Sequence, residues 1–133
     1  MRIKKFNEST EYNEVQDILN IARDEDYYVI FSKTNDVYAA RTGHTHAISI
    51  QVDTGDDYTR TPISKEDQMS FLLMCKNIED RLKHSFNANL SISCNDNFFE
   101  KGKQSIPVSR LIDNLEKWHN IDIDFAFCTI RIK

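Results

Sequence analysis

The chain has 133 residues, of which 40% are apolar and 11% aromatic, with only three glycines and two prolines. This composition excludes disordered and fibrous proteins. The length predicts a single domain, residues 1–133, that buries enough surface to fold without disulfides or metals. The formal net charge of −4 disfavours nucleic acid as a partner, because no overall positive field attracts phosphates.

The three cysteines, Cys75, Cys94 and Cys128, are widely separated and lie among apolar residues. This pattern is typical of reduced structural thiols, so we expect a cytoplasmic protein. The basic N-terminal segment has no apolar stretch behind it, and no run approaches the about 18 apolar residues of a membrane span, so we expect no membrane insertion. The richness in Ile, Asn, Asp and Lys suggests an AT-rich genome, bacterial or phage.

The N-terminal half of the chain predicts one helix and three strands. Apolar residues at spacings of three and four predict a helix over 9–23. Aromatic and β-branched residues predict a strand over 27–33, and the turn that follows predicts a hairpin with 37–41 as its return strand. Strict alternation predicts a third strand over 46–53, so the three strands are expected to form an antiparallel meander.

The C-terminal half predicts two helices and two further strands. A capping signature followed by an apolar stripe predicts the longest helix, over 65–86. Alternation predicts a strand over 88–94, and 98–101 is a candidate for a short extra strand. Residues 107–118 predict a helix that begins with proline. In the last strand, 121–132, the apolar positions change from odd to even, which predicts a bulge or burial on both faces.

Together these elements predict an α+β domain, a two-layer sandwich with the element order α-β-β-β-α-β-α-β. It combines an antiparallel meander with a strand-helix-strand unit.

The segment QVDTGDD, residues 51–57, resembles the active-site segment of retroviral-type aspartic proteases. The resemblance implies that Asp53 faces its own copy in a dimer and shares a proton with it. That family is almost entirely β and rich in glycine, whereas a long helix is predicted directly downstream of this segment. We therefore interpret Asp53 and Gly55 as the end of a strand and a turn.

His44 and His46 form a His-x-His pair, whose side chains point to the same side of an extended segment. Such a pair can chelate a divalent metal, with Asp53, Asp56 or Asp57 as candidates for the remaining ligands. The alternative function is therefore a metal-dependent hydrolase or phosphoesterase centred on His44 and His46. The ordinary interpretation is a solvated His44, a half-buried His46 and no cofactor.

The favoured function is a small non-catalytic binding or interaction protein, an accessory protein of a bacterium or phage, because the sequence holds no complete catalytic set. Tyrosines gather around the predicted meander and its acidic loop, and aromatic residues are enriched in interfaces. The candidate binding residues are Tyr38, Tyr58 and Arg60. We expect a protein partner or self-association, as a homodimer. A nucleic-acid-binding protein is a second alternative, which requires the scattered lysines to gather on one face.

Overall fold

The structure is a computed structural model, which describes residues 10–55, 61–96, 102–114 and 121–132. Tyr58 and Arg60, and the candidate strand 98–101, lie outside the described residues. The elements in chain order are α2 (Thr10–Asp24), β1 (Tyr27–Lys33), α3 (Asp36–Thr42), β2 (His46–Val52), α4 (Gln68–Lys83), β3 (Ser91–Asp96), β4 (Gly102–Pro107), α5 (Val108–Asp113) and β5 (Ile121–Ile130).

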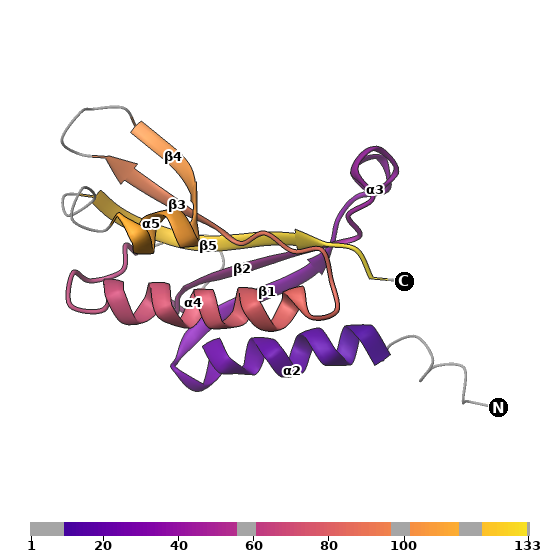
Figure 1. Ribbon diagram of the computed structural model, residues 1–133, viewed down its shortest axis with the longest axis horizontal. Helices are drawn as coiled ribbons and strands as arrows, with labels where there is room; N and C mark the ends of the chain where they lie inside the picture. Colours follow the sequence, from indigo (N-terminus) through magenta and orange to yellow (C-terminus); the bar gives the residue numbers. More distant parts are fainter. Residues whose placement is uncertain (1–9, 56–60, 97–101, 115–120, 133) are drawn as a thin grey trace.

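The fold is α+β with two layers, as the sequence predicted. The five strands form one antiparallel sheet in the order β1-β2-β5-β3-β4, so β5 is the central strand. Figure 1 shows α2 and α4 side by side along one side of this sheet. The core lies between the two layers and includes the buried side chains of Leu19, Ile48, Phe71, Ile92 and Ile123.

The segment Asp36–Thr42 is a helix, so the prediction of a return strand over 37–41 was wrong. The Asn35 side chain accepts a hydrogen bond from the Tyr38 amide at 2.7 Å and so caps the first turn. Gly43 closes the last turn in the left-handed conformation, with φ of 80°. The two caps and the helix-forming alanines between them outweigh the strand preference of Val37 and Tyr38.

The last strand contains the irregularity that its apolar pattern predicted. Ser93 of β3 lies opposite Phe125, whereas the next residue, Cys94, lies opposite Ile123, so Asp124 is an extra residue in β5. This bulge changes which face the following side chains occupy. As a result, Ile123 and Ala126 are both buried in the core, whereas Phe125 and Phe127 are partly exposed on the other face.

Strand β4 was not predicted, because its sequence GKQSIP is poor in strand-forming residues. Among the described strands it pairs only with β3, so it forms an edge of the described sheet. Pro107 ends β4, and α5 begins at the next residue, one position later than expected. Because β4 precedes α5, the expected strand-helix-strand unit contains an additional hairpin, and β3 and β5 are antiparallel neighbours.

The segment between β2 and α4 is fastened to the start of β5. Ile63 donates its backbone N–H to the Ile123 carbonyl at 2.7 Å, and Gln68 donates its side-chain amide to the Ile121 carbonyl at 3.2 Å. Lys65 forms an ion pair with Asp122 at 3.5 Å. Helix α4 begins at Gln68, three residues later than predicted, because the preceding residues form a turn in which Asp67 donates its backbone N–H to the Ser64 carbonyl at 2.9 Å.

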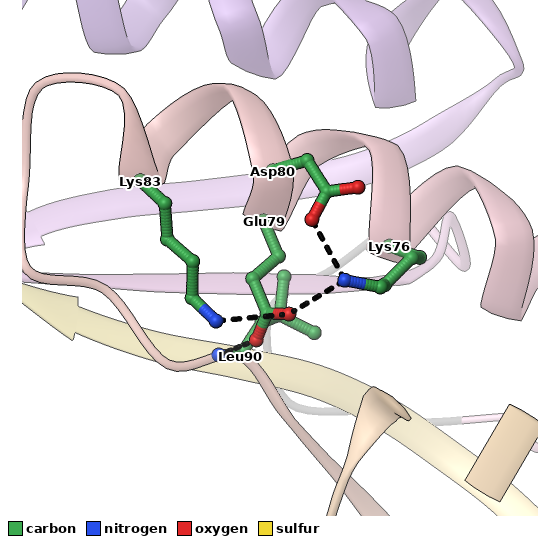
Figure 2. Close-up of polar contacts among 5 residues, drawn as sticks. All are labelled: Lys76, Glu79, Asp80, Lys83 and Leu90. Atoms are coloured by element: carbon green, nitrogen blue, oxygen red, sulfur yellow. Dashed lines mark hydrogen bonds and ion pairs between the residues drawn. The ribbon is translucent and has the colours of Figure 1, made fainter. Parts of the chain in front are cut away.

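A buried carboxylate joins α4 to the segment that precedes β3. Glu79 is 3% exposed, and its Oε2 accepts the backbone N–H of Leu90 at 2.8 Å. Figure 2 shows its other oxygen between the ammonium groups of Lys76 and Lys83, at 3.6 Å from each. A charge buried to this degree is stable only when it is paired and hydrogen-bonded, so Glu79 fixes the position of the α4–β3 connection.

Among the described residues, no helix is both long enough and apolar enough to cross a membrane.

Candidate functional site

One face of the sheet has none of the described helices α2, α4 and α5 packed on it, and we call it the open face. It is built from the side chains that alternate with the core residues along each strand. In β1, β2 and β5 these side chains form cross-strand rows, in which Ser49 lies between Ile30 and Phe127, and Ala47 lies between Ser32 and Thr129. Tyr28 and Gln51 are neighbours in the next row.

The centre of the open face carries an apolar cluster of Ile30, Phe125 and Phe127. The two phenylalanine rings lie on consecutive outward positions of β5, with their centroids 5.9 Å apart. All three side chains are partly exposed, and none belongs to the described residues that pack against the main core. A shallow hollow of about 390 Å³ lies over this cluster, and its lining also includes Ser49 and Thr129. The three side chains of the cluster therefore keep part of their apolar surface exposed.

Two polar residues under this surface have no hydrogen-bond partner within the described part of the chain. The residues are Ser49 and Gln51. The Ser49 hydroxyl oxygen and the side-chain amide oxygen and nitrogen of Gln51 are all buried. Buried polar groups in proteins are nearly always hydrogen-bonded, so each exception requires an explanation, such as water or a bound group. Ser49 is among the residues that line the hollow, although its hydroxyl is itself buried.

Helix α3 stands at one end of the open face. The Thr129 hydroxyl lies 3.0 Å from Nδ1 of His44, and the His44 ring lies 6.3 Å from the ring of Tyr38. In Figure 1, α3 projects from the end of the sheet, away from α2 and α4. None of its residues is buried, and Val37 and Tyr38 are 69% and 38% exposed. Tyr38, a predicted binding residue, therefore borders the open face.

The structure does not bring the three predicted metal ligands together. His44 contacts Thr129 on the open face, whereas His46 is buried on the helical side against the rings of Tyr12 and Phe31. Asp53 follows the other end of β2, about 23 Å from His46 at the usual rise of a strand. Across the described residues, no three histidine, cysteine, aspartate or glutamate side chains are grouped to hold a metal ion.

Asp53 instead shapes the turn that follows β2. Its carboxylate accepts the backbone N–H of Gly55 at 3.0 Å, and Gly55 has φ of 89°, which favours glycine. This geometry agrees with the interpretation of the Asp-Thr-Gly segment as a strand end and a turn.

His46 is placed where protonation is costly. Its Nδ1 lies 2.8 Å from the Thr45 hydroxyl, and its pKa is lowered, first by burial and then by the charge of Lys33. The unfolded chain therefore binds a proton at this residue more readily than the folded chain does. Stability contributed by neutral His46 is present above the ordinary histidine pKa and is lost as the pH falls through the lowered pKa.

We therefore expect the free energy of unfolding to fall between pH 7.5 and pH 5, and to fall less in a His46→Phe variant. Phenylalanine keeps an aromatic ring against Tyr12 and Phe31 but does not titrate. Urea unfolding at each pH measures the effect, with His84→Gln as the control, because His84 is exposed. The same pH dependence in His46→Phe and in the wild type would contradict this assignment.

The cysteines are buried and chemically quiet. Burial raises the pKa of the Cys128 thiol to about 12 and raises the pKa of Cys75 further still. A thiol acts as a nucleophile in its thiolate form, so neither group is suited to catalysis. Cys94 is also buried and is not in a disulfide.

Sequence reasoning missed the residues at the centre of the open face. Phe125 and Phe127 were assigned with Ile121 and Ile123 to one apolar face, because all four occupy odd positions. The bulge at Asp124 separates the two pairs. The change from odd to even positions was the one available signal for this separation.

No family model, no curated protein and no solved structure matches the chain.

Proposed function

We propose that the protein is a non-catalytic binding module that docks another protein chain on its open face. The observation that carries the proposal is the apolar cluster of Ile30, Phe125 and Phe127, which faces away from the molecule's own core. Protein interfaces combine an apolar, aromatic centre with a polar rim. Here the hollow supplies the centre, and serines, threonine and charged residues of the surrounding strand positions supply the rim.

The charges around the open face favour a protein over nucleic acid. Exposed aromatic rings on a sheet can stack on single-stranded nucleic acid, but such sites also need basic side chains that follow the phosphates. Asp53, Asp122 and Asp124 lie at one end of β2 and β5, and Arg131 lies at the other end, so basic side chains do not line the whole face. Lys65 lies nearby, but its ammonium group is already paired with the carboxylate of Asp122.

We also propose that the module works in the cytoplasm. In the described fold Cys75, Cys94 and Cys128 are buried and outside any disulfide, which suits a reducing compartment.

A photo-reactive benzoylphenylalanine at position 127, introduced in the cells that produce the protein, tests the proposal. We expect cross-links to discrete protein species. The matched control carries the same residue at position 73, because Leu73 is 52% exposed on α4, in the opposite layer. An absence of protein cross-links at 127, or the same products from both positions, would contradict the proposed docking surface.

A further inference from the structure

We infer that the open face docks on the open face of a second copy of this chain, as a two-fold dimer in which the two β5 strands are antiparallel. The inference rests on the proposed function, because it uses the same surface. It adds the identity of the partner and the orientation of the complex. Two features carry it: the charges at the two ends of β5, and the position of Phe127 between them.

The two ends of β5 have opposite charge. Asp122 and Asp124 are half-exposed near its start, and Arg131 is exposed directly after its end. Lys65 pairs with Asp122 at 3.5 Å, so Asp124 is the acidic group on which the argument depends. Lys103 of the edge strand β4 lies toward the same end, with β3 between it and β5. At the usual rise of a strand, the seven residues from Asp124 to Arg131 span at most about 23 Å.

A two-fold axis that lies in the interface, perpendicular to β5, brings the acidic end of each copy's β5 to the basic end of the other copy's β5. It reverses the partner's β5, so that Asp124 of each copy faces Arg131 of the other. An axis parallel to β5 would place Asp124 against its own copy, which like-charge repulsion disfavours. The charges therefore select the antiparallel arrangement.

In this arrangement the apolar cluster lies at the centre of the interface, close to the two-fold axis. The midpoint between positions 124 and 131 falls between 127 and 128, so the axis passes close to Phe127. Phe127 then lies close to its own copy, and Phe125 lies toward the Thr129 end of the second copy's strand. Two sheets that pack face to face are about 10 Å apart, a distance that phenylalanine side chains from both sides fill. The hollow over Phe127 is thereby closed.

Helix α3 fits the same arrangement. It stands at the Thr129 end of the open face, and it projects away from the layer of α2 and α4 (Figure 1). In the antiparallel dimer, this end lies over the partner's Asp124. The exposed residues Tyr38 and Arg41 then flank the partner's acidic end. This accounts for a capped helix that buries none of its own side chains.

Sedimentation equilibrium over a range of concentrations tests the inference. We expect the wild type to dimerise, and Phe127→Lys to weaken the dimer by about a hundredfold or more, because it places a charge at the centre of the interface. Leu73→Lys is the matched control on the helical layer and should leave the dimer unchanged. Circular dichroism and thermal melting establish that each variant is folded. A monomeric wild type, or a dimer that Phe127→Lys leaves intact, would overturn the inference.

Charge exchange tests the orientation. Asp124→Arg and Arg131→Glu should each weaken the dimer by about tenfold, because each replaces two attractions by two repulsions. An equimolar mixture of the two variants should recover dimers of near wild-type affinity, because both cross-subunit pairs become attractive again. A mixture that associates no better than the separate variants would overturn the antiparallel arrangement.

The two proposals fail in different ways. A monomeric wild type whose position 127 cross-links to a different protein would overturn the second copy as partner and would leave the docking surface supported. A monomeric wild type without protein cross-links at 127 would overturn both.

Discussion

Replacing Glu79 by alanine is expected to lower the free energy of unfolding by about 2–3 kcal/mol. The substitution removes the acceptor for the backbone N–H of Leu90, which the carboxylate binds at 2.8 Å. A buried donor without a partner costs the folded state its full desolvation energy. Lys76 and Lys83 also lose the carboxylate that lies 3.6 Å from each ammonium group (Figure 2). Urea unfolding of the purified variant measures the loss.

Two further substitutions separate the contribution of the hydrogen bond to Leu90 from that of the surface ion pairs. Glu79→Gln retains an oxygen that can accept the Leu90 N–H, so it should lose about half as much stability as Glu79→Ala. Asp80→Ala is the control, because Asp80 pairs with Lys76 at 2.7 Å but is 57% exposed. Surface pairs contribute about 0.5 kcal/mol or less on a helix, so this control should lose little. Equal losses for Glu79→Ala and Asp80→Ala would contradict the role given to Glu79.

Replacing Phe71 by alanine is expected to cost about 3–5 kcal/mol, the usual range for deleting a buried aromatic ring. Phe71 is fully buried in α4, and its ring meets that of Tyr27 of β1 edge-on, with centroids 5.0 Å apart. The substitution therefore opens a cavity where α4 meets the sheet. Thermal or urea unfolding measures the loss.

Leu73 provides the matched control for Phe71, because it lies two residues further along the same helix and is 52% exposed. Leu73→Ala removes an apolar side chain without creating a cavity and should change stability by about 0.5 kcal/mol or less. A loss at Leu73 as large as the loss at Phe71 would mean that α4 presents a different face to the sheet.

The fold class was predictable from the sequence because most elements have a strong apolar period. Helix α4 places most of its apolar residues on one face and strand β2 places all but Ala47 on one face, and both were predicted close to their observed bounds. The signals were weaker where burial does not select the residues. Helix α3 buries nothing, so its apolar pattern carries no information, and only Asn35 and Gly43 mark its ends.

The candidate site was harder to predict than the fold. An open face and a core face have similar apolar residues when both carry aromatic rings, and sequence alone does not say which face the helices cover. The His-x-His spacing predicted a shared direction for His44 and His46 on the assumption of an extended strand. Because β2 begins only at His46, His44 lies in the preceding loop and turns to Thr129 instead. Tyr38 was predicted as a binding residue, and it borders the open face because α3 carries it there.

We expect binding to use the open face rather than the helical layer. Carbene footprinting of the wild-type protein tests it most directly, by comparing the dilute purified protein with the protein in extract of the cells that produce it. We predict reduced labelling of Ile30, Phe125 and Phe127 in the extract, with unchanged labelling of Met69 and Leu73, which are exposed on α4. Reduced labelling of Met69 and Leu73 with no change on the open face would contradict the claim.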